Sequence, residues 1–192
     1  MTVADVFRPG APTAARTYDL ALMVGGSLVV ALSSQVEFHL PGTPVPITLQ
    51  TLSVLLVGAL LGARRGGLAL LAYLAQGAAG LPVFSGGAGG FAHILVPTGG
   101  YLIGFVAAAV VVGALAERGW DRSPWSTAAA MALGNLAIYT FGVVRLAGFV
   151  GADQVLPLGV IPFLPGDLVK IAIASALLPV GWRVIGERPA GL

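Results

Sequence analysis

An acid and a cation stand three positions apart in an otherwise apolar part of the chain. Asp167 and Lys170 occur in the segment Phe163-Leu-Pro-Gly-Asp-Leu-Val-Lys170. Residues at i and i+3 of a helix share one face, and charges in apolar segments are kept mainly where they bind or relay something. One interpretation is a ligand-binding pair, with a carboxylate acceptor and an ammonium cation. The alternative is an internal salt bridge in which Asp167 helps to cap the helix.

Further polar residues could extend such a site, and each has a structural alternative. Arg145 could hold an anion or snorkel to the lipid headgroups. Gln50 follows a Pro-x-Pro turn and could hydrogen-bond a polar ring, whereas Thr48 could bind there or cap the next helix. Polar groups in apolar helices by default bond to neighbouring helices. That default, with ligand contact as the alternative, applies to Tyr73, Gln76, Asn135 and Tyr139, and of these four only Tyr73 is counted among the candidate substrate-binding residues.

Aromatic and hydroxyl side chains occur close to these positions. Phe84 and Tyr101 could wall a mostly apolar pocket, or belong to the core. Ser85 and His93 share one Gly-rich segment and join the candidate ligand-binding residues. Read as nucleophile and base, the same two residues would indicate an intramembrane serine hydrolase, but no orienting acid accompanies them.

Several chemistries are excluded by composition. The chain has no cysteine, and His39 and His93 share no ligand spacing, so neither a disulfide framework nor a metal site is expected. The glycine run at 86–90 is not followed by Lys-Ser/Thr, and no Walker motif is present. We expect no cofactor, no ATP hydrolysis by this chain and no binding of nucleic acid.

The composition indicates an all-α integral membrane protein. Of 192 residues, 57% are hydrophobic and 9% are charged, whereas soluble domains carry about 25% charged residues. Residues 1–16 predict a flexible cytoplasmic segment, and residues 17–188 a compact bundle of six transmembrane helices. The helices are predicted at about 18–38, 49–61, 66–80, 98–117, 126–150 and 165–184.

Basic residues give this bundle an orientation. Of the ten Lys and Arg residues, all except Arg145 and Lys170 fall on one side when the helices alternate. They are Arg8, Arg16, Arg64, Arg65, Arg118, Arg122, Arg183 and Arg188. Short cytoplasmic loops are rich in Lys and Arg, so both termini are predicted to be cytoplasmic.

The three outer connections, at 39–48, 81–97 and 151–164, contain no Lys or Arg and are apolar and rich in Pro and Gly. Irregular backbone at membrane depth is tolerated where protein or a cavity covers it. We therefore expect these loops to fold over a ligand pocket. Small residues on the first helix, Ala21, Gly25 and Gly26, could let a partner helix approach, or pack inside the bundle.

Four stretches, in this order, resemble the BioY family, the biotin-specific S components of energy-coupling factor (ECF) transporters. They are Pro44-Val-Pro-Ile-Thr-Leu-Gln-Thr-Leu52, Gly77-Ala-Ala-Gly-Leu-Pro-Val-Phe84, Pro97-Thr-Gly-Gly-Tyr-Leu-Ile-Gly-Phe105 and the segment 163–170 that holds the acid–lysine pair.

The resemblance implies a six-helix bundle in the cytoplasmic membrane of a bacterium or archaeon. It would bind biotin from outside, beneath closing loops. The implied partners are a transmembrane coupling protein, docked on the small-residue face, and two ATPase subunits that alone use ATP. It maps the family's acid and lysine onto Asp167 and Lys170. Left open are homo-oligomerisation, an S component for another vitamin, a structural or channel-like subunit, and whether Lys170 or Arg145 meets the biotin carboxylate.

Overall fold

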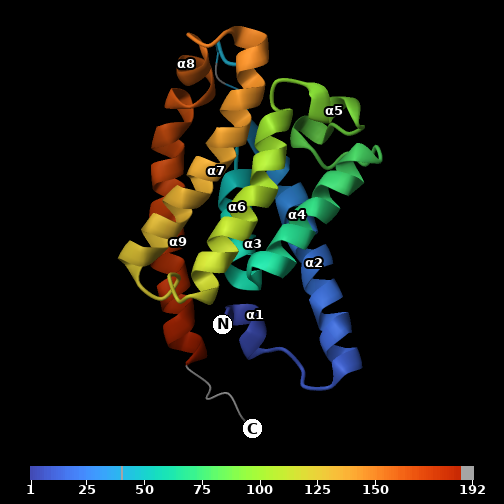
Figure 1. Cartoon of the computed structure of the whole chain (residues 1–192), viewed down its shortest axis with the longest axis vertical. Helices are drawn as coiled ribbons and strands as arrows, with labels where there is room; N and C mark the ends of the chain where they lie inside the picture. Colours follow the sequence, from blue (N-terminus) through green and yellow to red (C-terminus); the bar gives the residue numbers. More distant parts are fainter. Residues whose placement is uncertain (40, 187–192) are drawn as a thin grey trace.

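The structure, a computed structural model, describes residues 1–39 and 41–186 and is a bundle of helices (Figure 1). Its longer helices are α2 (Pro12–Ser34), α3 (Gln50–Leu61), α4 (Ala63–Ala78), α6 (Gly99–Glu117), α7 (Pro124–Val150) and α9 (Leu164–Ile185). Among the described residues, α2, α6, α7 and the stretch Val155–Ile185 are long and apolar enough to cross a membrane.

The loop end of the bundle carries short elements. They are the strands β1 (Glu37–Phe38) and β2 (Ile47–Thr48), and the short helices η1 (Ser85–Gly87), α5 (Ala92–Leu95), α8 (Val155–Gly159) and η2 (Ile161–Phe163). The strands pair in antiparallel fashion, with Glu37 opposite Thr48. A hairpin therefore fills the first outer connection, which the sequence predicted only as a loop.

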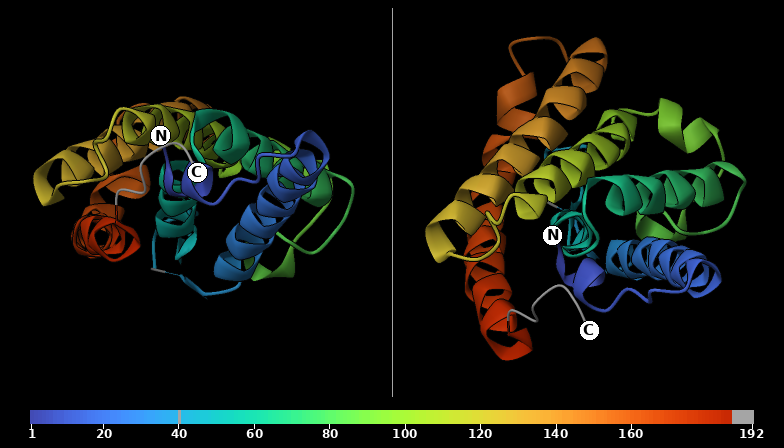
Figure 2. Two further views of the ribbon diagram at one scale, coloured as in Figure 1. Left: turned by 90° about the horizontal axis from the view of Figure 1, so that it is seen from below. Right: turned by 60° about the horizontal axis from the view of Figure 1, so that its bottom comes forward.

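Helix α3 lies at the centre of the bundle and contacts α2, α4, α6 and α9 (Figure 2). Glycines allow the close approach: a Cβ on Gly58 would lie 2.7 Å from the carbonyl oxygen of Ala109, and one on Gly113 only 2.4 Å from the amide nitrogen of Ala63. Small residues bring membrane helices together in this way. The short helices α3 and α4 thus pack closely against α6.

The outer surface of the bundle is apolar. Leucine and valine side chains stand exposed along the long helices, among them Leu28 and Leu32 on α2, Val144 on α7, and Leu168 and Leu177 on α9. Facing water, such a surface would be an extensive exposed hydrophobic patch. Facing lipid tails, it is the expected exterior of a membrane bundle.

Most predicted helices match the observed ones, and the first differs most. Helix α2 begins at Pro12 and not near residue 18, because Pro12 stands in the first helical turn, where its missing N–H is no loss. It ends at Ser34, and β1 takes the residues predicted to continue it.

Residues 1–16, expected to be a flexible segment, hold α1 (Val3–Val6) and the first turn of α2. Thr2 and Ala4 are buried. The backbone N–H of Thr2 donates to Asp5 Oδ2 (2.8 Å), and Arg65 on α4 bridges Asp5 and Asp19, each at 2.7 Å. Burial raises the pKa of Asp5, but hydrogen bonds from Thr2 and Arg65 outweigh it and leave that pKa below its ordinary value.

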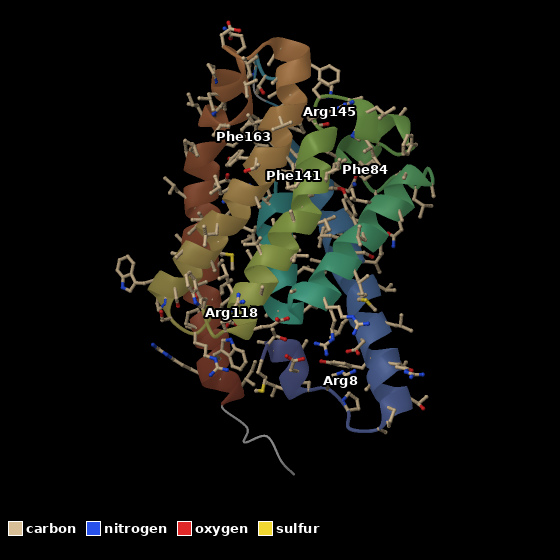
Figure 3. The ribbon with its side chains drawn as sticks, viewed as in Figure 1. Arg8, Phe84, Arg118, Phe141, Arg145 and Phe163 are labelled. Carbon is tan, nitrogen blue, oxygen red and sulfur yellow. The ribbon has the colours of Figure 1, made fainter. Side chains whose placement is uncertain are left out.

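The arginines gather at the end of the bundle opposite the hairpin and the short helices. Figure 3 shows Arg8 and Arg118 there, whereas Arg145, Phe84 and Phe163 lie toward the loop end. The predicted tail residue Arg188, and with it the predicted domain end, lies outside the described residues. We refer below to the basic end and the loop end.

Candidate ligand-binding site

A cavity of about 390 Å³ lies beneath the elements of the loop end. Its walls come from the hairpin, the segment around η1, and helices α3, α6, α7 and α9. Of the ten residues predicted to bind substrate, eight line it: Thr48, Gln50, Phe84, Ser85, His93, Tyr101, Asp167 and Lys170. The cavity thus joins residues from all four stretches that carry the resemblance.

Asp167 and Lys170 form an ion pair that also faces the cavity. Lys170 Nζ lies 3.6 Å from Asp167 Oδ1, and the two side chains are only 11% and 7% exposed. Lys170 also donates to the carbonyl oxygen of Thr48 (2.8 Å) and to Thr51 Oγ1 (2.7 Å). Tyr139 on α7 donates its hydroxyl to Asp167 Oδ2. The two interpretations of this pair, salt bridge and ligand site, are therefore compatible.

Gln50 and Thr48 are positioned by one another at the start of α3. Thr48 Oγ1 accepts from the backbone N–H of Gln50 (3.2 Å), the first residue of α3, although Leu49 occupies the N-cap position. Thr48 also lines the cavity. Gln50 Nε2 donates to the hydroxyl of Tyr73 at 2.7 Å. Tyr73 is fully buried and does not line the cavity. The structure thus places Tyr73 behind Gln50, where it orients the amide.

Aromatic side chains form the wall beside the second outer loop. Phe84 is fully buried, meets Tyr73 edge-on at 5.6 Å and stacks on His93 at 5.2 Å between ring centroids. Gly77 makes room for it, since a Cβ there would lie 2.1 Å from the Phe84 ring. Ser85 donates its hydroxyl to Glu37 and not to His93, so the serine–histidine arrangement of a hydrolase is not formed.

Hydrogen bonds tie the three outer connections to one another and to the bundle. Thr43 Oγ1 donates to the carbonyl oxygen of Leu158 (2.6 Å), joining the first connection to the third. Gln35 Nε2 donates to the carbonyl oxygen of Phe84 (3.1 Å), at the edge of the second. The hydroxyl of Tyr101 donates to Gly159 (2.8 Å). These contacts hold the loops over the cavity without enclosing it completely.

Arg145 does not line the cavity. Its guanidinium donates to the carbonyl oxygen of Leu95 at the end of α5 and lies 5.1 Å from the ring centroid of Phe149. The expectation that Arg145 binds substrate therefore has no geometric support. Its position instead fastens the second outer loop to α7.

The sequence prediction left out several residues that line the cavity. Glu37, Thr51, Asn135 and Tyr139 are polar, whereas Leu102 and Phe105 add apolar surface. Asn135 and Tyr139 stand at i and i+4 of one helix, a signal visible in the sequence that we assigned by default to interhelical bonds. No comparable signal marked Glu37, because its role depends on the hairpin.

A groove of about 490 Å³ between α7 and α9 adjoins this cavity. Asn135, Tyr139 and Asp167 line both spaces, and the rest of the groove is almost wholly apolar. These three side chains therefore form a polar partition between the cavity and the groove.

The proposed docking face on α2 divides in two. Ala21 is exposed, and a Cβ on Gly25 would meet nothing within 4 Å. Gly26 is buried, and its Cβ would lie 3.2 Å from both Ala69 and Val57. Only Ala21 and Gly25 thus lie on an open face, while Gly26 serves packing inside the bundle.

Comparison with known proteins finds one family and several similar chains. The model of the BioY family matches residues 8–187. A biotin transporter BioY of Rhizobium etli is 39% identical over 184 residues, covering 90% of this chain and 98% of the relative. A probable biotin transporter BioY of Pyrococcus horikoshii is 44% identical over 149 residues, covering 77% and 88%.

A solved structure shares the fold. The crystal structure of the S-component for biotin from an ECF-type ABC transporter superimposes with a TM-score of 0.79, covering 89% of this chain and 94% of that one. At 23% sequence identity, this likeness supports the arrangement of the helices.

Proposed function

This chain belongs to the BioY family, a family of multi-pass membrane proteins, and on that premise we propose that it binds biotin and serves its uptake as the substrate-specificity subunit of an ECF transporter. The family is a transporter component and not an enzyme. The proposed chain crosses the membrane six times, with α3 and α4 as short spans, and keeps its basic end and both termini in the cytoplasm. The cavity then faces outward.

One observation carries this proposal. An acid–lysine ion pair with no net charge is buried in a mostly apolar cavity beneath the outer loops. Binding pockets are typically apolar with a few placed polar groups. Biotin has a polar ureido ring, an apolar thiophane ring and an apolar chain that ends in a carboxylate. Asp167 can accept from a ureido N–H, and the aromatic wall suits the thiophane ring.

The geometry suggests a role for Lys170 at the same end of the ligand. Its ammonium lies 3.6 Å from the Asp167 carboxylate, whereas the ureido ring and the carboxylate of biotin are separated by the length of a hydrocarbon chain. A residue beside Asp167 is better placed to donate to the ureido carbonyl oxygen than to the distant carboxylate. The carboxylate would then lie near the loops, where the ring nitrogens of His39 and His93 offer donors.

The partners follow from the same proposal. As a subunit of an ECF transporter, a chain without a Walker motif needs ATPase subunits and a coupling protein for ATP-driven uptake. We place the coupling protein against the open face of α2 around Ala21 and Gly25. Neither a cofactor nor a metal is required for binding.

Binding of labelled biotin by the purified protein tests the proposal. We expect saturable binding that unlabelled biotin displaces and that thiamin or riboflavin do not. Comparable binding of all three vitamins would indicate an S component of another specificity. No retention of biotin by well-folded protein would overturn the proposal.

A further inference from the structure

Asn135 on α7 presents an unused hydrogen-bonding group to the cavity. Its residue surface is 6% exposed, and its side-chain oxygen has no hydrogen-bond partner within the described part of the chain. The neighbouring Gly134 allows this burial, since a Cβ there would lie 2.4 Å from Leu55 and 2.5 Å from Val112. Close contact of α7 with α3 and α6 thus presses Asn135 into the cavity wall.

An unpaired amide in such a place needs an explanation. Burying a polar group without a partner is unfavourable. An apolar side chain at this position of the helix would avoid that cost. Interhelical bonding, the default role for this residue type, is not what the structure shows. The unpaired oxygen lies in the partition that Asn135 shares with Tyr139 and Asp167.

The other buried unpaired atoms among the described residues are different. Those of Asp121 and Arg145 belong to groups in which another atom is hydrogen-bonded, to Trp182 and Leu95 respectively. That of Ser175 does not line the cavity. Asn135 therefore combines an unpaired oxygen with a position in the cavity wall.

We propose that the Asn135 side-chain oxygen accepts one N–H of the ureido ring while Asp167 accepts the other. The two ring N–H bonds diverge on either side of the ring carbonyl, so one carboxylate cannot accept from both. Asn135 and Tyr139 stand one turn apart on α7, and Tyr139 bonds to Asp167 on α9. Two acceptors thus approach the cavity from neighbouring helices. This inference rests on the proposed binding of biotin.

The variant Asn135→Leu keeps the branched shape and the number of side-chain heavy atoms and removes the amide. We expect at least a tenfold loss of biotin affinity, together with an unchanged or raised melting temperature of the ligand-free protein. Removing an unpaired buried polar group should not destabilise the protein, whereas removing a structural hydrogen bond would. Thr140→Val is the matched control: Thr140 lies on the same helix, lines only the groove and bonds to the backbone of Leu136.

Two biotins, each methylated on a different ureido nitrogen, identify the contact. For the analogue whose missing N–H is the one that Asn135 accepts, wild type and Asn135→Leu should bind alike. For the other analogue and for biotin, the variant should bind more weakly. Thr140→Val should bind all three ligands like wild type.

Three results would overturn the inference. In the first, the variant binds biotin as tightly as wild type. In the second, the variant loses affinity by the same factor for biotin and both analogues, which shows that the amide does not contact a ureido N–H. In the third, its ligand-free melting temperature falls while the folded fraction binds normally, which indicates a structural role. Failure of the wild type to bind biotin is a separate outcome, because it removes the proposed function itself.

Discussion

At the scale of single residues, Asp167 is held from three sides. Tyr139 donates to one carboxylate oxygen, and Thr51 and Lys170 approach the other at 3.5 and 3.6 Å. Two of these partners come from other helices, so the carboxylate is fixed before a ligand arrives. Preorganisation of this kind reduces the entropy lost on binding.

Asp167→Asn should lower biotin affinity while the protein still folds. The amide keeps one acceptor but loses the charge-assisted part of the bond, about 1.5–3 kcal/mol, which is about a 10- to 100-fold change in affinity. Lys170 also loses its counter-ion, so some destabilisation is expected. Calorimetry with biotin, beside melting of the ligand-free protein in the same detergent, separates the effects. A collapse of stability with normal binding by the folded fraction would leave Asp167 a purely structural ion-pair partner.

Lys170→Ala should weaken biotin and biotin amide by the same factor. Both ligands carry the ureido carbonyl that we assign to Lys170, and they differ only in the charge at the far end. The expected loss is again about 10- to 100-fold for a charged hydrogen bond. A clearly greater loss for the acid than for the amide would show that Lys170 meets the carboxylate, which is one of the two options that the sequence left open.

The sequence predicted many residues of this site, but not the directions in which their side chains point. Asp167 and Lys170 stood out because buried charges are rare, and their spacing put them on one face. Spacing does not reveal which face points inward, so Tyr73 and Arg145 were expected to contact substrate. Tyr73 instead lies behind Gln50, and Arg145 holds a loop carbonyl. Asn135 was visible as a polar residue, but only the packing around it showed that its oxygen is unpaired.

At the scale of elements, apolar runs and Pro or Gly signals predicted the long helices closely. The outer connections were harder, because their conformation depends on contacts between distant segments. The pairing of β1 with β2, and the bond from Thr43 to Leu158, join residues that no local pattern relates. A small number of hydrogen bonds nevertheless holds these loops over the cavity.

Arg145→Met should loosen one of the contacts that hold the loops over the cavity. It removes the guanidinium that binds the carbonyl oxygen of Leu95, while keeping an unbranched side chain against Phe149. We expect biotin dissociation to become several-fold faster, with association also faster or unchanged. Exchange of bound labelled biotin against excess unlabelled biotin measures this rate. Arg118→Met, on the exposed basic end, is the control, and equal rates in the two variants would argue against a role in loop closure.

Helix α2 offers a comparison between adjacent glycines. Gly25→Leu should leave biotin binding intact but impair co-purification with the coupling protein, because the new side chain projects from an open face. Gly26→Leu should destabilise the chain itself, since it must displace Ala69 and Val57, and overpacking costs about 1–3 kcal/mol. Normal assembly of the Gly25 variant would remove this face from the proposed interface.

At the scale of the whole molecule, the two ends of the bundle have different roles. The loop end encloses the cavity, and the basic end is held by ion pairs that join α1, α2 and α4. The charge pattern of the sequence predicted which residues share the basic end. It did not predict the packing of residues 1–16, because the ion pairs formed by Asp5 and Arg65 span most of the first third of the chain.

Asp5→Asn should lower the melting temperature at neutral pH. The folded-state pKa of Asp5 lies below the ordinary value of 3.8, so the carboxylate stabilises the fold above that value. This contribution is lost as the pH falls through the folded-state pKa. The difference between variant and wild type should therefore be full at pH 7 and shrink below 3.8. The control is Asp153→Asn: a bond from Gln154 also lowers the pKa of Asp153, but this exposed carboxylate bonds locally, to its sequence neighbour, so the variant should show a much smaller difference. A pH-independent difference for Asp5→Asn would exclude ionisation as its cause.

The docking of the first residues also bears on how the protein is handled in the laboratory. The Met1 ammonium donates to the carbonyl oxygen of Glu117 at 2.8 Å, and Thr2 beside it is fully buried. A shortened version that lacks residues 1–7 would lose the buried Thr2 and the ion pair between Asp5 and Arg65. Such a version should give a lower yield of folded protein than the full sequence, although it leaves every residue of the cavity in place.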